Sequence, residues 1–209
     1  TFSVAADIDY KEAVDVLAAV GVLEGSDNKF DPKAELTREQ AAKIIAYLDL
    51  GKSTAEALPA VKVFNDVEAT RWSAKFVAYC ADAGYINGVG NGNFDPTGKL
   101  TGYAFGKLLL CALGYDATIE EMTGASWTIK VAKLMEKNSI SKGTSKLGSA
   151  VLTREEAAQY ALNALKATMV EYDDKGSTIA AGAVTVITGA KKAQAVTGVD
   201  SKYASISND

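Results

Sequence analysis

The chain contains the series Gly-Val-Leu-Glu-Gly (21–25), Phe-Asp-Pro (30–32) and Leu-Thr-Arg-Glu (36–39), and two further copies follow it with decreasing fidelity. The second copy reads Gly-Tyr-Ile-Asn-Gly, Phe-Asp-Pro and Leu-Thr-Gly-Tyr, at 84–88, 94–96 and 100–103. The third copy keeps only Ile-Ser-Lys-Gly and Leu-Thr-Arg-Glu, at 140–143 and 152–155. Units of roughly 50 to 60 residues are marginally stable alone and bury their apolar faces against one another. The pattern therefore predicts three repeats that share one core.

The composition is that of a folded protein without a polyanion-binding surface or a membrane span. Of the 209 residues, 48% are hydrophobic and 23% are charged, which is the range of soluble domains. A net charge of −4, with no run of lysine and arginine, argues against general nucleic-acid binding. The apolar run at 108–113 is far too short to cross a bilayer. We expect no nucleic-acid partner and no membrane insertion.

Side chains that usually carry chemistry are scarce. The chain has no histidine, which removes the commonest general base and the commonest transition-metal ligand. Cys80 and Cys111 lie in apolar helical stretches, so buried free thiols are favoured, although a disulfide forms if the two helices face each other. The chain starts at Thr1 rather than Met, which fits a secreted protein whose signal peptide has been removed. We expect no cofactor.

Helical periodicity predicts two helices in the first copy. Apolar side chains share one face of a helix over 10–20. Thr37 begins the second helix, because it is a good N-cap and Gln40 completes a capping box. Phe30 is expected to plug the core between the two helices. Residues 51–60 are expected to form a linker.

The second and third copies repeat this plan with local defects. In the second copy the stretch from Trp72 to Cys80 and the segment after Thr101 have helical spacing. Phe94 is the expected core plug, but Ala104 cannot close a capping box. In the third copy, helices are expected near Trp127 and from Thr153, and the plug is missing.

The pattern changes beyond Tyr172. Residues 178–188 are small and β-branched and are interrupted by Gly182, which predicts a weak strand pair. Residues 190–209 are polar and aperiodic. We interpret residues 173–209 as a linker, or as the start of a following region.

The three copies resemble the S-layer homology family over about residues 1–172. The family's opening aspartate and tryptophan are matched by Asp66-Val67 and Arg71-Trp72-Ser73, with arginine where histidine is common. Its Thr-Arg-Ala-Glu signature is matched by Thr37-Arg38-Glu39-Gln40 and Thr153-Arg154-Glu155-Glu156. The second copy departs from this signature, because Gly102 replaces the arginine.

The resemblance implies a mainly α fold in which three helix-loop-helix repeats form a pseudo-threefold prism around a shared helical bundle. The repeats would span 1–58, 59–116 and 117–172, followed by a short β or irregular tail. Family members anchor secreted surface proteins to the cell wall of Gram-positive-type bacteria. They bind an anionic, often pyruvylated, secondary cell-wall polysaccharide in grooves between repeats. A non-catalytic anchoring module is therefore the implied function.

The start of the second helix in each copy has an electrostatic feature that agrees with an anionic ligand. Arg38 and Arg154 each follow the N-cap threonine, where a cation opposes the positive end of the helix dipole. Free backbone N–H groups at that end favour an anion, and a guanidinium adds a two-pronged donor suited to a carboxylate. The alternative is that Glu39 and Glu155 neutralise the arginines. If arginine marks a working groove, the second copy is mainly scaffold, and Gly102→Arg leaves binding unchanged or improves it.

Two interpretations stay open for the aromatic and glycine residues. Trp72 and Trp127 either stack on a sugar or belong to the core, and Trp72 is the better candidate for a groove. Gly88 either brings its backbone close to a glycan or serves a tight turn. The predicted ligand-binding residues are Arg38, Arg154, Thr37, Thr153, Glu39, Glu155, Trp72, Arg71, Asp66 and Gly88.

Functions of other classes are less well supported. The adjacent acids at 120–121, 155–156 and 173–174 fall at helix starts or in the tail, where capping and solvation explain them. Asp27, Asn28 and Asp31 lack the central glycine and the bidentate glutamate of a calcium loop, so we expect no metal site. Peptidoglycan binding, or a purely structural role in S-layer assembly, is the alternative. Self-association would then use regions outside this chain.

Overall fold

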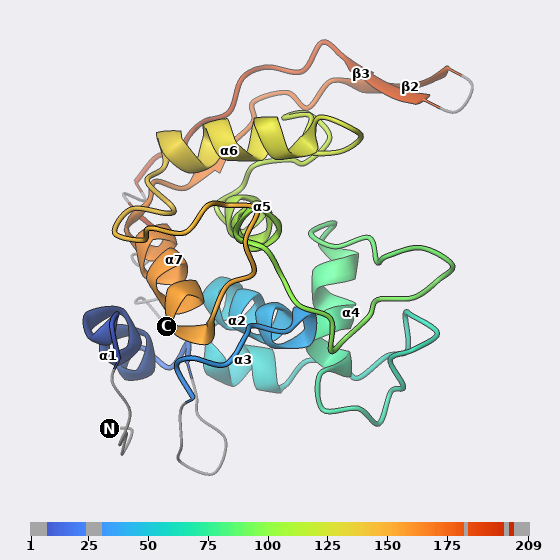
Figure 1. Cartoon of the computed structure of the whole chain (residues 1–209). Coiled ribbons are helices and arrows are strands. Elements are labelled where there is room, and N and C mark those ends of the chain that lie inside the picture. Colours follow the sequence, from blue (N-terminus) through green and yellow to red (C-terminus); the bar gives the residue numbers. More distant parts are fainter. Residues whose placement is uncertain (1–7, 24–30, 182–183, 199–200, 203–209) are drawn as a thin grey trace.

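A computed structural model describes residues 8–23, 31–181, 184–198 and 201–202, and this part of the chain is mainly helical (Figure 1). The predicted mainly α class is confirmed. The helices are α1 (Lys11–Ala19), α2 (Arg38–Leu50), α3 (Lys52–Glu56), α4 (Ala74–Asp82), α5 (Gly102–Ala112), α6 (Trp127–Lys137) and α7 (Arg154–Lys166). The strands are β1 (Val170–Glu171), β2 (Ser177–Ala181), β3 (Val184–Thr188) and β4 (Gln194–Ala195).

The helices pair between repeats rather than within them. The first helix of each repeat packs against the second helix of another, so that α1 contacts α7, α4 contacts α2 and α6 contacts α5. Helix α5 also contacts both α2 and α7. Figure 1 shows α1, α4 and α6 on the outside of this group. Each repeat thus covers the apolar face of a neighbour, which ties the stability of one repeat to that of the next.

The segments that precede α2, α5 and α7 meet in a closed ring of backbone hydrogen bonds. The N–H of Leu36 donates to the carbonyl of Leu152 (2.9 Å), and that of Leu152 donates to Leu100 (3.0 Å). The N–H of Leu100 completes the ring by donating to Leu36 (3.2 Å). All three leucine side chains are buried. The leucine of each Leu-Thr motif therefore brings the starts of the three second helices to one point.

The predicted helix caps are confirmed. Thr37 and Thr153 each accept a hydrogen bond from the N–H three residues on, and Gln40 and Glu156 bond back to close the capping boxes. Thr101 accepts from the N–H of Ala104, which has no side chain that could complete a box. These caps fix where α2, α5 and α7 begin, and hence where the residue after each threonine lies.

Core positions agree with the sequence where they are described. Phe94 is buried and its ring stacks on Phe64, with the ring centroids 5.4 Å apart. Phe30, the plug expected in the first copy, lies outside the described residues. Cys80 and Cys111 are free and buried, as the favoured interpretation held.

The expectation of a plain linker at 51–60 is wrong, because α3 forms within it. Gly51 adopts a left-handed φ of 76°, which ends α2 and lets the chain turn directly into the short helix. Ala55 is fully buried, and the hydroxyl of Tyr47 bonds to the carboxylate of Glu56. One buried alanine in a five-residue helix gives too little periodicity to be recognised in the sequence.

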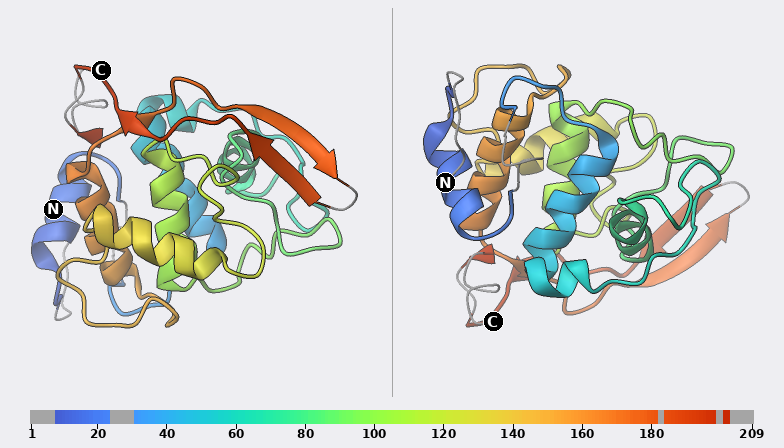
Figure 2. Two further views of the ribbon diagram at one scale, coloured as in Figure 1. Left: turned by 90° about the horizontal axis from the view of Figure 1, so that it is seen from above. Right: turned by 90° about the horizontal axis from the view of Figure 1, so that it is seen from below.

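The predicted strand pair is confirmed as the antiparallel hairpin β2–β3, in which Ile179 lies opposite Val186. Figure 2 shows the hairpin extending beyond the helices. The stretch after residue 190 is not wholly irregular, since β4 pairs with β1 through Val170 and Ala195. The N–H of Lys202 also donates to the carbonyl of Ala167, at the end of α7 (3.1 Å). The segment after the third repeat therefore returns to the helices.

A buried ion pair joins this returning segment to the end of α2. The Nζ of Lys202 donates to Asp49 Oδ1 (2.6 Å), and both side chains are almost fully buried. The hydroxyls of Tyr79 and Tyr85 donate to Asp49 Oδ2 (2.7 and 2.6 Å). Burial, together with this carboxylate, raises the pKa of both tyrosines, so their hydroxyls stay protonated donors. Asp49 is thus neutralised and hydrogen-bonded inside the protein.

Replacing Lys202 with methionine keeps the apolar stem and removes the charge. We expect the free energy of unfolding to fall by about 3–5 kcal/mol, the range for removing one partner of a buried ion pair, because the carboxylate of Asp49 loses its counter-ion and keeps only the two tyrosine hydrogen bonds. Urea unfolding followed by circular dichroism measures this loss. Lys192→Met, at an exposed site in the same segment, is the control. Equal unfolding midpoints for the two variants would show that the ion pair is not stabilising.

Candidate anionic-ligand site

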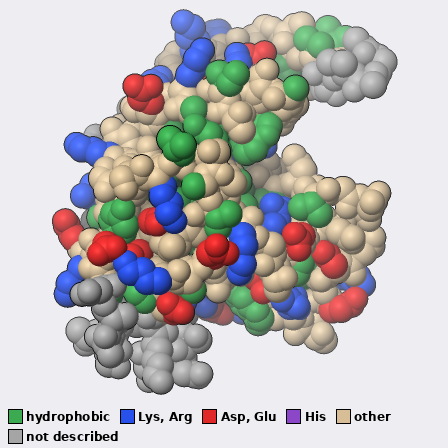
Figure 3. Space-filling model, in the orientation of Figure 1, with side chains coloured by type: hydrophobic (Ala, Val, Ile, Leu, Met, Phe, Trp, Pro, Cys, Tyr) green, Lys and Arg blue, Asp and Glu red, His purple; other side chains and the backbone are tan. Residues whose placement is uncertain are grey.

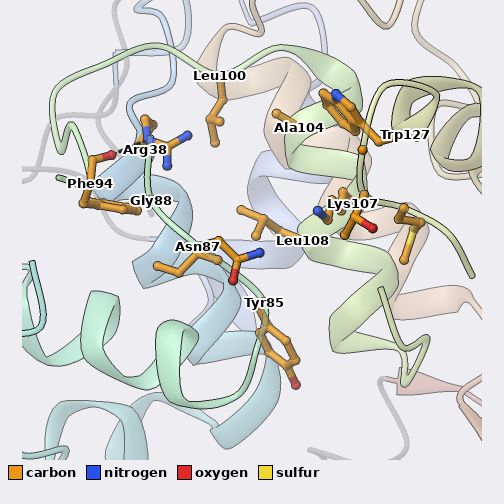
Figure 4. Close-up of a pocket in the computed structure, with 14 residues that line it drawn as sticks. Arg38, Tyr85, Asn87, Gly88, Phe94, Leu100, Ala104, Lys107, Leu108 and Trp127 are labelled. Atoms are coloured by element: carbon orange, nitrogen blue, oxygen red, sulfur yellow. Dashed lines mark hydrogen bonds between the residues drawn. The ribbon is translucent and has the colours of Figure 1, made fainter. Parts of the chain in front are cut away.

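A pocket of about 350 Å³ opens where all three repeats meet. We call it the Arg38 pocket. Arg38 at the start of α2 lines one side, the loop from Tyr85 to Gly88 lines another, and Lys107 of α5 and Trp127 of α6 lie opposite Arg38 (Figure 4). The molecular surface is hollowed between the regions of α6 and α4 (Figure 3). None of the 14 lining residues is acidic.

Arg38 is held in place by the second repeat. Its Nε donates to the carbonyl of Phe94 (2.7 Å), and its guanidinium lies over the Phe94 ring, 4.7 Å from the centroid. The terminal nitrogens of Arg38 make no hydrogen bond to the described residues. Burial lowers the pKa of Arg38, while the carboxylates of Asp95 and Asp66 act in the opposite direction. The side chain therefore presents a fixed two-pronged donor to the pocket.

Lys107 supplies a second cation that the sequence analysis did not single out. Its Nζ lies 5.9 Å from the centroid of the Trp127 ring, and no carboxylate of the described residues pairs with it. Burial lowers the pKa of this half-buried ammonium. An anion in the pocket would offset the lost solvation of both cations. Lys107 was missed because a single lysine within the apolar helix 102–112 resembles an ordinary solvated position.

The backbone at the start of α2 does not offer the free N–H groups that were expected. The N–H groups of Arg38 and Glu39 donate to the carbonyls of Gly98 (2.8 Å) and Pro96 (3.0 Å) of the next repeat. Equivalent bonds hold the start of α7, where Arg154 and Glu155 donate to Ala34 (2.8 Å) and Pro32 (3.1 Å). That expectation is wrong, since inter-repeat loops satisfy these donors. An anion near Arg38 would be held by side chains.

Helix α6 begins at the same pocket, and no capping bond or acidic residue offsets the positive end of its dipole. Its N-cap, Ser126, makes no side-chain capping bond, and its first turn contains no acidic residue. Trp127, Thr123 and Gly124 at this helix start all line the pocket. The positive end of the α6 dipole thus adds to the field of the two cations.

Of the residues predicted to bind ligand, Glu39 and Arg71 connect the first two repeats, whereas Asp66 makes its hydrogen bonds within the second repeat. Glu39 is buried and accepts two hydrogen bonds from Arg71 (2.7 and 3.0 Å) and one from Ser73 Oγ (2.7 Å). Asp66 accepts hydrogen bonds from the N–H groups of Phe94 and Asp95 (both 2.8 Å). It thereby fixes the loop that carries the Phe94 carbonyl, to which Arg38 donates. Glu39 therefore does not pair with Arg38.

The third repeat uses its glutamate in the same way. Glu155 is buried and accepts from Lys33 Nζ (2.5 Å) and from the N–H of Asp9 (2.9 Å), just before α1. Arg154 is half-buried, and burial lowers its pKa while Asp31 acts in the opposite direction. The loop residues 24–30, which precede Asp31, lie outside the described residues. A groove at Arg154 stays a prediction.

The remaining predicted residues are distributed unevenly. Gly88 lines the Arg38 pocket, and an added Cβ there would lie 2.5 Å from the carbonyl of Asn93. Its φ of 77° also requires glycine, so the tight turn explains it directly. Trp72 is half-exposed near Lys43 and does not line this pocket, whereas Trp127 does. Thr37 and Thr153 serve as the helix caps described above.

The space beside Gly102 is occupied by neighbouring residues. A Cβ at this position would lie 2.7 Å from the hydroxyl of Tyr160 and 3.2 Å from the backbone of Gly148. Gly148 in turn lies against the ring of Tyr103. An arginine at 102 has to displace Tyr160, a buried side chain of α7. We therefore expect Gly102→Arg to destabilise the start of α5, while the expectation that it leaves binding unchanged or improves it stays a prediction.

No helix of the described residues is long and apolar enough to span a membrane. The described residues also contain no cluster of acids and cysteines suited to a metal ion.

Comparison with known proteins links the repeats to bacterial surface proteins. The chain is 29% identical over 160 residues to the S-layer protein sap of Bacillus anthracis, covering 71% of this chain and 19% of that protein. It is 30% identical over 162 residues to the surface-layer 125 kDa protein of Lysinibacillus sphaericus, covering 71% and 13%. It is 28% identical over 144 residues to an uncharacterized cell wall amidase of Bacillus anthracis, covering 64% and 26%. The chain thus spans about a quarter or less of each relative.

The family comparison agrees with the motifs from which the repeats were recognised. The model of the S-layer homology domain matches residues 5–42 and 63–102, which hold the Gly-x-x-x-Gly, Phe-Asp-Pro and Leu-Thr motifs of the first two copies. The chain therefore contains an S-layer homology region of the kind found in bacterial surface proteins.

Proposed function

We propose that this chain is a non-catalytic anchoring module that binds an anionic, pyruvylated secondary cell-wall polysaccharide and holds a secreted protein at the bacterial envelope. The Arg38 pocket is the binding site in this proposal. Arg38 and Lys107 contact the charged substituent, and Trp127 stacks on the sugar. A wall-bound location agrees with the S-layer proteins that the chain resembles.

The observation that carries the proposal is that two cations line the pocket and no acidic residue does. Arg38 and Lys107 line one cavity that has no acidic lining residue, and α6 adds the positive end of its dipole. A carboxylate matches the two terminal nitrogens of a guanidinium, and an aromatic face beside a cation suits a charged sugar. A neutral glycan would leave Lys107 without a carboxylate partner in the described residues, and Arg38 with only the field of Asp95 and Asp66. The pocket chemistry thus favours an acidic saccharide.

We also infer that the three repeats, 1–58, 59–116 and 117–172, form a pseudo-threefold prism. The cyclic pairing of α1 with α7, α4 with α2 and α6 with α5 supports this arrangement. The hydrogen-bonded ring of Leu36, Leu100 and Leu152 supports an axis near the helix starts. In such a prism the pocket between repeats depends on all three being folded.

Co-sedimentation with cell-wall fragments tests the function. We expect the chain to bind intact walls, and to lose most of this binding when hydrofluoric acid has removed the secondary polysaccharide, because the proposed ligand is then absent from the walls. Undiminished binding to the stripped walls would favour the peptidoglycan-binding alternative. An absence of binding to either preparation would favour a purely structural role in S-layer assembly.

A further inference from the structure

A second cavity, of about 510 Å³, lies at the opposite end of α6 from the Arg38 pocket. Lys137 and Lys166, in the last turns of α6 and α7, line it together with Lys142 of the connecting loop. Its lining contains neither Gly102 nor Tyr103, so it is distinct from the filled site described above. We call it the lysine cavity.

The lysine cavity carries more positive charge than its surroundings balance. No carboxylate of the described residues pairs with Lys137, Lys142 or Lys166, and none lines the cavity. A lysine in the last turn of a helix ordinarily balances the dipole, which is equivalent to roughly half a negative charge at each C-terminus. Two helix ends therefore balance about one of the three lysines. All three lysines are exposed, so their ammonium groups are solvated, and what the cavity offers an anion is three neighbouring cations.

The walls of the cavity are fixed by hydrogen bonds that leave other polar groups available. Asn163 Nδ2 donates to the carbonyls of Ile140 and Lys142 (both 2.8 Å), which holds the loop against α7. Gln159 Nε2 donates to Asn163 Oδ1 (3.0 Å). The hydroxyls of Ser139 and Thr168 line the cavity without a hydrogen-bond partner in the described part of the chain. Such hydroxyls suit a ligand that itself carries hydroxyl groups.

Aligning the copies shows how the third repeat differs from the second. Gly143 matches Gly88, and Gln159 of α7 matches Lys107 of α5. The second repeat thus has its lysine in the middle of α5, whereas the third repeat has its lysines in the loop and at the ends of α6 and α7. The starts of helices line the Arg38 pocket, whereas the ends of helices line the lysine cavity.

We propose that the lysine cavity is a second subsite for an anionic saccharide, in which Lys142 and Lys166 bind the charged groups and Ser139, Thr168 and Gln159 bind hydroxyls. The kind of glycan in this proposal rests on the proposed function. The residues proposed to bind it are separate from those of the Arg38 pocket. A polymer that bears one charge per repeating unit can occupy both sites of one chain, which increases avidity beyond that of either site.

Isothermal titration of the full chain with two defined probes tests this subsite. Trigalacturonic acid carries its charge on carboxylates, and a glycerol-phosphate trimer carries it on phosphodiesters. We expect Lys142→Gln/Lys166→Gln to bind one of these probes at least tenfold more weakly than the unmodified chain, a loss of about 1.4 kcal/mol. The probe that responds identifies the charged group.

Lys133→Gln/Lys192→Gln is the matched control, since it removes the same charge from exposed positions that do not line the lysine cavity. We expect less than a twofold change in this control. An equal loss in both double variants, or no loss in either, would overturn the subsite.

Arg38→Gln/Lys107→Gln separates this proposal from the proposed function. If that variant alone loses wall binding and Lys142→Gln/Lys166→Gln keeps its probe affinity, the lysine cavity is not a site. If Lys142→Gln/Lys166→Gln loses probe and wall binding while Arg38→Gln/Lys107→Gln keeps both, the lysine cavity stands and the Arg38 pocket fails.

Discussion

Arg38→Gln/Lys107→Gln is expected to bind wall fragments at least 100-fold more weakly than the unmodified chain. Each cation would lose a hydrogen bond to a charged group, worth about 1.5–3 kcal/mol, and 1.4 kcal/mol is a factor of ten in affinity. Arg38 is fixed by Phe94, and Lys107 has no carboxylate partner in the described residues, so few competing contacts weaken the effect. Quantitative co-sedimentation over a range of wall concentrations gives the change in affinity.

Two controls separate this loss of binding from a loss of folding. Lys99→Gln/Lys133→Gln removes exposed positive charge outside the Arg38 pocket and is expected to change binding by less than twofold. Trp127 fluorescence, read in a Trp72→Phe background, reports the state of the pocket itself, since Trp72 does not line it. Full retention of wall binding by a folded Arg38→Gln/Lys107→Gln chain would refute the pocket as the binding site.

Much of the fold could be predicted because its signals are local. The apolar spacing and the threonine caps located the helices, since both act within a few residues of the chain. The helix α3 was missed because five residues give too little periodicity, and the pairing of β4 with β1 because the two strands lie far apart in the sequence. The buried pair of Lys202 and Asp49 is a clear example, since 153 positions separate the two residues.

The candidate site was harder to predict, because it is assembled from three repeats. Arg38 and Gly88 were found because they belong to the short motifs, whereas Lys107 lies outside them; its signal in the sequence is Lys43, which follows Thr37 by the same six positions. Glu39 was interpreted through its neighbour Arg38, but it is buried against Arg71 and Ser73 of the next repeat. A glutamate beside an arginine in sequence gives no indication of such an inter-repeat partner. The repeated motifs therefore indicated where the pocket lies. Most of the residues that determine its charge and its partners could be identified only from the fold.

Leu36→Ala is expected to lower the free energy of unfolding by about 2–5 kcal/mol, the usual cost of removing a leucine side chain from a closed core. Leu36 is fully buried, and its backbone bonds to both Leu100 and Leu152. The lost side chain leaves a cavity at the point where the three second helices begin, and the backbone ring limits how far the site can relax. Thermal and urea unfolding measure the loss.

The form of the transition matters as much as its midpoint. Since each repeat covers a neighbour's apolar face, Leu36→Ala should lower one cooperative transition of the whole chain rather than release the first repeat alone. Leu50→Ala, at a partly buried position at the end of α2, is expected to cost less than half as much. Trp127 fluorescence, read in the Trp72→Phe background, reports the third repeat, and far-ultraviolet circular dichroism reports all the helices. Separate midpoints for the two signals would mean that the repeats fold independently, and the shared core of the proposed prism would then be wrong.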